Sequence, residues 1–228
     1  MAVQTQKKFN FTCPKEIEHI YSKTSASGKR YYTTPNGKKL PSVTTVLGYA
    51  KRPIIEAWRA RVGVIEADRI SKKSSERGKR IHTICEKYLK GDSDYVKGLM
   101  PDAVSLFRGI KPYIDRIDNI HYLESRLWSF SLGMAGQVDL IAEFDGVLSV
   151  IDFKTSDRNK PEEWIDNYFC QCLAYAIMYE EIVGEPIEQI VVMMAVENGD
   201  SEIYVRKAED YVDPLINYIK VYTESLAA

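Results

Sequence analysis

Residues 136–156 read GQVDLIAEFDGVLSVIDFKTS, two runs of strand-forming residues on either side of the pair Asp145-Gly146. Both members of such a pair tolerate a positive φ, so the pair predicts a two-residue type I′ turn and a β-hairpin. The turn fixes the register of the hairpin, and counting outward along both strands places Asp139 opposite Asp152. We therefore expect two carboxylates side by side on adjacent strands.

These opposed carboxylates indicate a bound divalent cation. Opposed Cβ atoms lie about 4.5–5.5 Å apart, where like charges destabilise a sheet, and Mg²⁺ binds one or two carboxylates with water and phosphate oxygens. Lys154 lies two residues beyond Asp152, on the same face of its strand. The alternative is a hairpin whose polar side chains face water. The apolar run 147–153 argues instead for a buried strand, in which charges are paired or bind metals.

The composition is typical of a globular protein. The 228 residues, 45% of them hydrophobic, suffice for one large domain. No apolar leader follows Met1, and no run approaches the roughly 18 apolar residues of a membrane span, so we expect no contact with a membrane. The cysteines show no paired spacing, which favours reduced thiols in a cytoplasm; they are Cys13, Cys85, Cys170 and Cys172.

The charge is distributed unevenly along the chain. The net charge is −1, yet residues 51–90 carry twelve Lys and Arg against five Asp and Glu, a local charge of +7. Such a segment indicates a track for a polyanion, because neutralising phosphates supplies most of the non-specific affinity for nucleic acid. The alternative is a solvated helix face. The candidate DNA contacts in this segment are Arg69, Lys72, Lys73, Arg77, Lys79 and Arg80.

The remaining pattern predicts an α/β sandwich around one central mixed sheet flanked by helices. Small hairpins are expected between residues 17 and 40, and Ser42 can cap a short helix after them. Helices are expected over 53–89, with a break near 71–75, and over 101–117, 161–181 and 208–225. Strands are expected over 122–130, 134–144, 147–154, 187–196 and 202–205.

One edge of the helix before residue 89 carries Gly78, His82 and Glu86 at spacings of four. His82 then faces whatever the helix packs on, although a single helical histidine is more often a structural residue. A glycine in mid-helix costs about 1 kcal/mol relative to alanine. Gly78 therefore suggests that another backbone or a ligand approaches closely there.

These features resemble the PD-(D/E)XK nuclease superfamily, in particular its RecB-like branch. The resemblance lies in four elements in the family's order: Arg77-Gly78 with His82, Gly136-Gln137-Val138-Asp139, Ile151-Asp152-Phe153-Lys154-Thr155-Ser156, and Gln171 with Tyr175. It implies one nuclease domain over residues 1–228, with a helical and hairpin lobe over 1–75 and a restriction-endonuclease-like core over 76–228.

A looser similarity links other residues to mitochondrial genome maintenance exonucleases and their phage relatives, compact single-domain DNA exonucleases. It rests on Arg30-Tyr31-Tyr32, Pro41-Ser42-Val43-Thr44 and Trp58-Arg59. This similarity adds Ser42 and Thr44 to the candidate DNA contacts.

The resemblance implies a role for each matching residue. Asp139, Asp152, His82 and the carbonyl of Phe153 would hold Mg²⁺ or Mn²⁺, and the imidazole favours Mn²⁺. Lys154 would orient or activate the attacking water. The remaining catalytic candidates, Gln171 and Tyr175, would support the site and the DNA strand, and Glu124 and Glu86 are candidates for an outer contact or a second metal.

Two absences limit the cofactors. Some RecB-like nucleases hold an iron–sulfur cluster with one early and three late cysteines, whereas only Cys170 and Cys172 lie late in this chain. We therefore expect no iron–sulfur cluster. The chain also lacks a Walker A sequence, so a helicase activity would belong to another chain.

The leading hypothesis is a metal-dependent DNA exonuclease acting on single strands or strand ends in phage or bacterial replication, recombination or repair, with replication or recombination proteins as possible partners. One alternative is a structure-specific or sequence-specific endonuclease on the same fold, although the chain shows no separate recognition domain. Another is a non-catalytic nucleic-acid-binding module, against which the intact Asp139, Asp152 and Lys154 argue. Cleavage of linear and closed circular substrates separates the three.

Overall fold

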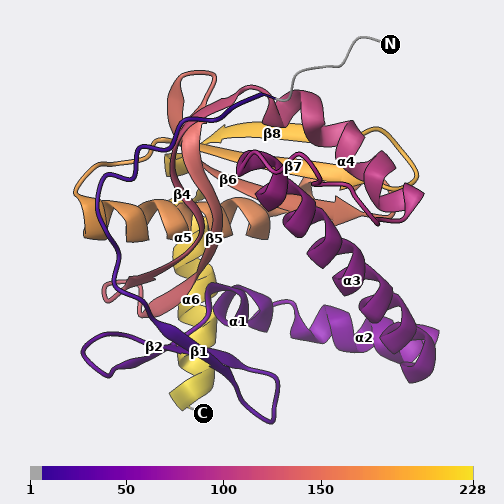
Figure 1. Ribbon diagram of the computed structural model, residues 1–228. Helices are drawn as coiled ribbons and strands as arrows, with labels where there is room; N and C mark the ends of the chain where they lie inside the picture. The colour runs from indigo at the N-terminus through magenta and orange to yellow at the C-terminus, as the bar shows by residue number, and fades with distance from the viewer. Residues whose placement is uncertain (1–6, 228) are drawn as a thin grey trace.

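The computed structural model describes residues 7–227 and contains two sheets and six α-helices within that range (Figure 1). Helices and 3₁₀ turns are α1 Val43–Tyr49, α2 Arg52–Val62, α3 Val64–Leu89, α4 Pro101–Ile114, η1 Glu162–Trp164, α5 Asp166–Val183, η2 Ala208–Tyr211 and α6 Val212–Ala227. Strands are β1 Tyr21–Thr24, β2 Arg30–Thr33, β3 Lys39–Pro41, β4 Ile117–Ser129, β5 Met134–Phe144, β6 Val147–Ser156, β7 Gln189–Val196 and β8 Glu202–Lys207.

The five-stranded central sheet has the order β4-β5-β6-β7-β8. Only β6 and β7 are parallel, and α5 supplies the crossover that parallel neighbours require. The turn between β5 and β6 is formed by Asp145 and Gly146 at φ 53° and 80°, which suits the expected type I′ turn. The predicted mixed sheet flanked by helices is thus confirmed.

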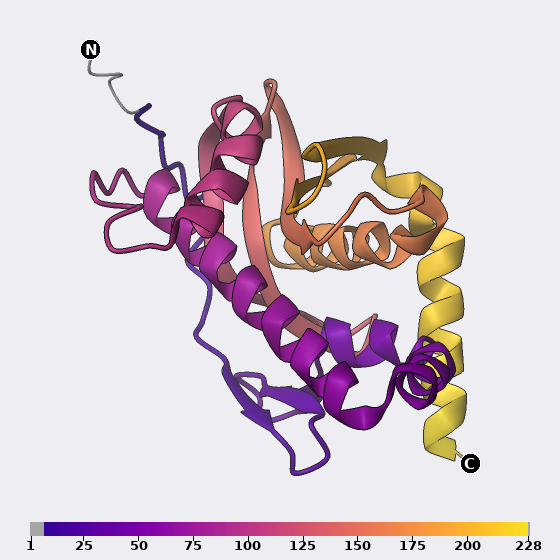
Figure 2. The same ribbon diagram turned by 90° about the vertical axis from the view of Figure 1, so that its right-hand side faces the viewer.

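Both faces of the central sheet are buried, because its strands lie between two layers of helices (Figure 2). Adjacent residues of β6 show the alternation: Val150 belongs to the core cluster that includes residues of α1, α5 and α6, whereas Ile151 belongs to the cluster that includes residues of α3 and α4. This double burial explains why residues 147–153 are almost wholly apolar.

The small sheet β1-β2-β3 is antiparallel and confirms the hairpins expected between residues 17 and 40. Tyr32 and Leu40 of this sheet form a small core with Ile20, which precedes β1, and Ala135 of β5. Ser42 follows β3 and caps α1 by accepting a hydrogen bond from the Thr45 backbone N–H. The small sheet is therefore tied to the strand that carries Asp139.

Helices α1, α2 and α3 form a continuous arch over residues 43–89. Its first foot, α1, packs against α5 and α6, and its second, α3, packs against β6 and α4. The middle helix, α2, contacts α3. The two ends of the arch therefore contact the core of the protein at two separate places.

The structure corrects several expected boundaries. The break expected near residues 71–75 lies at Gly63, whose φ of 86° ends α2, and the serines are interior residues of the continuous α3. The expected lobe boundary after residue 75 therefore falls inside a helix. The helix expected over 101–117 ends at Ile114 because the chain enters β4, and the helices expected from 161 and 208 each begin with a short 3₁₀ turn.

Residues 1–6 and 228, included in the expected domain, lie outside the described residues. Within residues 7–227, no helix combines the length and the apolar character needed to cross a membrane.

Candidate active site

Three carboxylates from adjacent strands lie in a row across the central sheet. The paired residues on either side of Glu124 in β4 place it opposite Asp139 in β5. The last β5–β6 pair, Leu140 with Ile151, brings Asp139 next to Asp152. The hairpin register predicted from the turn is therefore confirmed. The sheet also places Glu124, which was a candidate only for an outer contact or a second metal, opposite Asp139.

His82 of α3 completes a group of possible metal ligands. Its Nδ1 lies 3.3 Å from Asp139 Oδ1 and 3.7 Å from Glu124 Oε1. One ligand atom from each of these three residues lies within 4.8 Å of the others. An imidazole nitrogen with two carboxylate oxygens suits Mn²⁺ and, with added water, Mg²⁺.

Asp152 lies beside this group but has other partners. It forms an ion pair with Lys154 and accepts a hydrogen bond of 3.0 Å from Gln171 Nε2. The structure therefore groups Glu124, rather than Asp152, with His82 and Asp139. At Phe153 it shows the backbone N–H donating to Asp139 Oδ2 at 2.9 Å, whereas the expected ligand was the carbonyl oxygen.

The attraction between His82 and Asp139 raises the pKa of the imidazole and lowers the pKa of the carboxyl group. Burial alone would lower the pKa of His82, but the charge of Asp139 and the Glu124 carboxylate outweigh burial and raise it to about 10. Burial would likewise raise the pKa of Asp139, yet the nearby His82 and Lys154 hold it below its ordinary value. His82 and Asp139 thus form an ion pair when no metal is bound.

Asp152 shows the opposite shift from Asp139. Burial is the main reason that the pKa of Asp152 rises to about 6; the charge of Asp139 adds to the rise, and Lys154 opposes it. Burial would lower the pKa of Lys154, but the two aspartates raise it above its ordinary value. Lys154 therefore carries a positive charge at neutral pH.

Helix α5 packs on strand β5 next to the residues of the site. The buried Tyr175 of α5 packs so closely on Gly136 that a Cβ there would lie 2.5 Å from the tyrosine Oη. The next residue, Gln137, donates a hydrogen bond of 2.5 Å to Glu124 Oε2. In the run Gly136-Gln137-Val138-Asp139, Gly136 leaves space for Tyr175, Gln137 is the hydrogen-bond partner of Glu124, and Asp139 supplies a carboxylate to the site.

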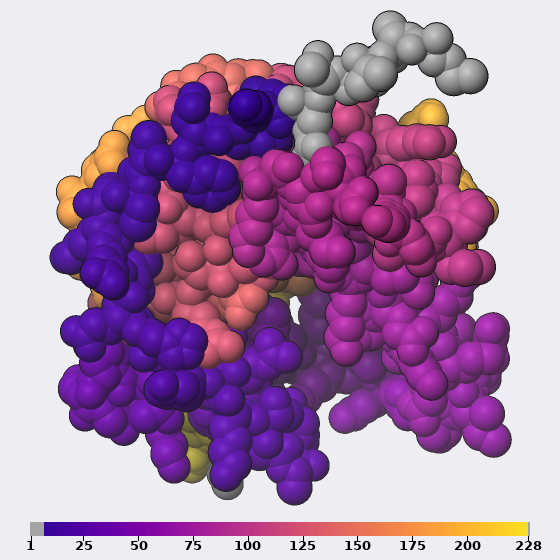
Figure 3. All heavy atoms as spheres, in the orientation of Figure 1, coloured from indigo at the N-terminus to yellow at the C-terminus, as the bar shows by residue number. Residues whose placement is uncertain are grey.

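A cavity of about 880 Å³ lies over these groups, between α1 and α3. Figure 3 shows the molecule hollowed between the indigo N-terminal segment and the magenta α3. The cavity exposes His82, Glu124, Asp139 and Lys154, and Gly78 lies on its wall. A Cβ at Gly78 would contact only Thr155 Oγ1, at 3.9 Å, so no backbone requires a glycine there.

Some of the expected DNA contacts reach this cavity. Lys79 of α3 and Ser42 and Thr44 at the start of α1 line it, as does Glu86. The exposed Lys72 has no ion pair among residues 7–227. These cations and hydroxyls can contact a phosphate chain above the carboxylates.

Other residues of the basic segment are engaged within the protein. Arg77 is buried and pairs with Glu197 at 2.6 Å, and Lys73 pairs with the same carboxylate at 3.0 Å. This corrects the expectation that Arg77 lies open to a phosphate: it fastens α3 to the end of β7. Arg69 pairs with Glu66, and Arg80 lies 3.7 Å from Asp102.

Glu124, expected only as a candidate for an outer contact or a second metal, lies in the group of possible metal ligands. Its φ of 51° is left-handed, which is uncommon for a residue with a side chain. Strand β4 is also irregular, with a register shift between Asp118 and Tyr122. A count outward from the β4–β5 connection would have placed Glu124 opposite Asp139, and that was the available signal.

The part of the chain that contains most of the site matches a family of nucleases. Residues 105–213, which include β4 to β7 and α5, match the model of the PD-(D/E)XK nuclease superfamily. This match covers just under half of the chain and agrees with the resemblance inferred from the motifs.

Two individual relatives are similar to this chain. Mitochondrial genome maintenance exonuclease 1 of Mus musculus is 29% identical over 147 residues, which cover 60% of this chain and 43% of the mouse protein. The Homo sapiens protein is 28% identical over 138 residues, covering 54% and 38%. The match thus spans less than half the length of either relative.

A solved structure of a protein from Eubacterium rectale, named as a candidate exonuclease, is also similar. It has 12% sequence identity and a TM-score of 0.48, and the match covers 68% of this chain and 66% of that chain.

Proposed function

We propose that this protein is a metal-dependent DNA exonuclease that hydrolyses phosphodiester bonds from strand ends and prefers single-stranded DNA. The observation that carries the proposal is that His82, Glu124 and Asp139 line one cavity together with Lys154, which is paired with the buried Asp152. The similarity to two proteins named exonucleases supports action from ends.

In this proposal His82, Glu124 and Asp139 hold Mg²⁺ or Mn²⁺, with Asp152 and the Phe153 carbonyl completing the cation's surroundings. A bound cation of this kind polarises a phosphoryl oxygen and lowers the pKa of bound water. Lys154 orients the attacking water and stabilises the negative charge that develops on the scissile phosphate. Gln171 holds the Asp152 carboxylate in place through its hydrogen bond.

The cavity beneath the arch suits a single strand better than a duplex. A single strand binds through its phosphates and through bases stacked on aromatic rings. Tyr31 and Trp58 are partly exposed and can stack on a base, whereas Tyr32 is buried in the core of the small sheet and cannot. A strand that enters below a continuous arch needs a free end. In this proposal, one domain that includes the N-terminal lobe both binds the DNA and cleaves it.

The biological setting in this proposal is replication, recombination or repair of DNA in the cytoplasm of a bacterial or phage-infected cell. Nuclease action on DNA is the part of the proposal that the superfamily supports.

The test is cleavage of end-labelled linear and covalently closed single-stranded DNA by purified protein with Mg²⁺ or Mn²⁺. We expect short products from linear strands, slower cleavage of blunt duplex and resistance of closed circles. Asp139→Asn, Asp152→Asn and Lys154→Ala should each lose about 10²–10³ in rate while still binding DNA, because each removes a charge fixed at the reacting phosphate.

Asp145→Asn is the matched control, because Asp145 is an exposed carboxylate in the β5–β6 turn and pairs with Arg116. It should keep wild-type activity. Undiminished cleavage by Asp152→Asn would refute the site assignment. Rapid cutting of closed circles would replace the exonuclease by an endonuclease on the same site.

A further inference from the structure

A second basic region lies mostly before the basic segment 51–90 in the sequence. Between Glu18 and Glu56 the chain contains no Asp or Glu. The same interval carries seven cationic residues, Lys23, Lys29, Arg30, Lys38, Lys39, Lys51 and Arg52, although the whole chain has a net charge of −1. This acid-free segment folds into the small sheet, α1 and the start of α2.

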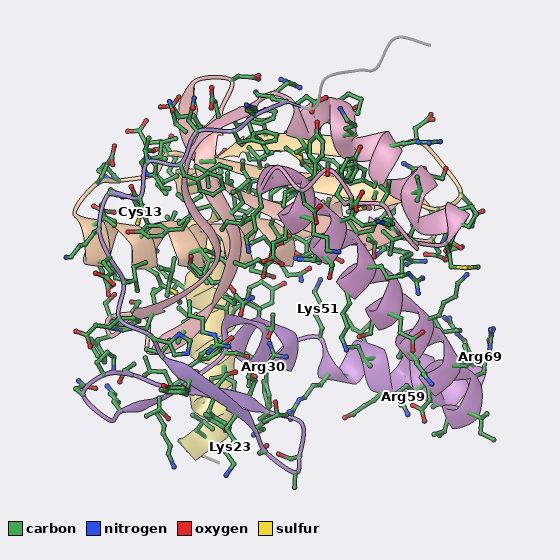
Figure 4. The ribbon with its side chains drawn as sticks, in the orientation of Figure 1. Cys13, Lys23, Arg30, Lys51, Arg59 and Arg69 are labelled. Carbon is green, nitrogen blue, oxygen red and sulfur yellow. The ribbon has the colours of Figure 1, made fainter. Side chains whose placement is uncertain are left out.

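Part of the acid-free segment encloses a cavity of about 290 Å³. Its lining is entirely polar, cationic or glycine: Thr24, Ser27, Gly28, Lys29, Arg30, Thr44, Thr45, Gly48 and Arg52. Arg30 and Thr44 also line the active-site cavity, so the two cavities adjoin. Figure 4 shows Arg30 where the small sheet meets α1, and Lys23 at the outer edge of the same sheet.

The three cations of this cavity lack acidic partners. Within residues 7–227, neither Lys29, Arg30 nor Arg52 forms an ion pair with a carboxylate. This differs from α3, where Lys73 and Arg77 share the carboxylate of Glu197. Three uncompensated cations around one polar cavity favour an anionic ligand.

The backbone of this cavity is held in a fixed shape. The Arg30 N–H donates to Thr45 Oγ1 at 3.3 Å, and the Arg30 carbonyl accepts from the Ser42 N–H at 2.8 Å. Arg52 stacks on the ring of Tyr49, with its guanidinium carbon 4.8 Å from the ring centroid. The hydrogen bonds join the hairpin that carries Lys29 and Arg30 to α1, and the stacking on Tyr49 joins Arg52, at the start of α2, to the same helix.

We propose that this cavity is a phosphate-binding subsite for the part of the DNA strand that lies outside the active site. The inference rests on the proposed nuclease function and extends it by naming the path of the strand. Lys29, Arg30 and Arg52 contact successive phosphates, and the hydroxyls of Thr24, Ser27 and Thr45 donate to phosphate oxygens. The strand therefore runs from the carboxylates past Thr44 and Arg30 onto the small sheet.

The test compares the double variant Lys29→Ala/Arg52→Ala with Lys23→Ala/Lys39→Ala. The second variant removes two cations from the same sheet, but neither of them lines the cavity. Binding of labelled oligonucleotides from about 4 to about 16 nucleotides is measured in EDTA, so that cleavage plays no part. A thermal melt of each variant verifies that it is folded.

We expect Lys29→Ala/Arg52→Ala to weaken binding of long oligonucleotides and to leave binding of the shortest ones unchanged. The slope of log affinity against log salt should fall by about 1.4, since each lost phosphate contact on a single strand contributes about 0.7. With metal present, KM for long strands should rise while kcat is retained. The control variant should keep the wild-type length dependence.

Equal salt slopes and equal length dependence in the two variants would overturn the subsite and leave the nuclease proposal intact. If wild-type protein cleaves no DNA, the proposed function fails, and the binding measurements still decide whether the cavity contacts a strand. If Lys29→Ala/Arg52→Ala does not fold, Lys29→Gln/Arg52→Gln supplies the same comparison, because glutamine keeps most of the apolar side-chain length.

Discussion

His82 is the residue at which the proposed metal site is coupled most directly to pH. Its pKa is raised to about 10, from an ordinary value of 6.5, by the carboxylates of Asp139 and Glu124. A cation can bind the imidazole only after that proton leaves. Between about pH 7 and 9 we therefore expect Mn²⁺ binding to release close to one proton, and the affinity to rise about tenfold per pH unit.

Calorimetry at about pH 8, in two buffers of different ionisation enthalpy, measures this proton directly. A histidine with an ordinary pKa would already be neutral at that pH and would release none. His82→Gln should abolish the release and weaken binding. His121→Gln is the matched control, because His121 contacts Tyr179 and lies outside the group of ligand atoms. Absence of proton release in the wild type would contradict the shifted pKa.

At the residue scale, the sequence predicted those side chains whose positions follow from one local turn. Asp139, Asp152 and Lys154 lie within a few residues of Asp145-Gly146, so the hairpin register placed them together. Glu124 joins them from β4, whose register depends on a separate connection to β5, so the Asp145-Gly146 turn alone did not place it. Arg77 was placed on an open face because its partner Glu197 is far away in the sequence.

At the scale of elements, the contact between α5 and β5 sets how precisely the carboxylates are held. Gly136→Ala would drive a Cβ to 2.5 Å from Tyr175 Oη and 2.8 Å from its Cε1, and both lie in a packed core. We expect a loss of about 1–3 kcal/mol in the free energy of unfolding, as for other overpacked sites, together with reduced cleavage. Urea unfolding of the metal-free protein measures the first effect.

Gly48→Ala serves as the control for that substitution. Gly48 lies in α1 with no atom within 4 Å of an added Cβ, so alanine should be neutral or stabilise by up to about 1 kcal/mol. Adding Tyr175→Phe to Gly136→Ala removes the nearest clashing atom and should restore part of the stability. Equal stabilities of Gly136→Ala and Gly48→Ala would show that the packing of Tyr175 is not close.

The order of the elements was predictable from the sequence, but several ends were not. The strands β5 and β6 were recognised because a turn and a buried apolar run bound them. The break between α2 and α3 was misplaced because serines at residues 71–75 resemble helix caps. In the structure these serines lie in the middle of α3 and are exposed to solvent. The single Gly63 between valines, at a φ of 86°, forms the true break.

At the scale of the whole molecule, both feet of the arch are fastened by side chains distant in sequence. Lys51 Nζ donates to Trp164 O at 3.2 Å and to Asn167 Oδ1 at 2.5 Å, which joins the start of α2 to the start of α5. Arg77 joins α3 to Glu197 beyond β7. Lys51 and Asn167 are 116 residues apart in the sequence, and Arg77 and Glu197 are 120 residues apart. No local sequence pattern could therefore predict these contacts.

An arch fastened at both feet has a consequence for how long the enzyme stays on its substrate. In the proposed exonuclease, a strand held beneath the arch would leave by sliding out at an end, so we expect slow dissociation between successive cuts and processive degradation. When excess unlabelled DNA is added after the reaction starts, the wild type should finish the strands already bound. Lys51→Met and Glu197→Gln should instead leave a ladder of partly shortened strands, because a loosened arch releases its strand sideways.

Lys97→Met is the control for that experiment, since it removes an equally simple ion pair, with Asp94, that lies outside the arch. If all three variants complete bound strands as the wild type does, the fastened arch does not retain the strand. If only the two arch variants leave ladders, the contacts of Lys51 and Glu197 at the feet of the arch set the number of nucleotides removed in each encounter.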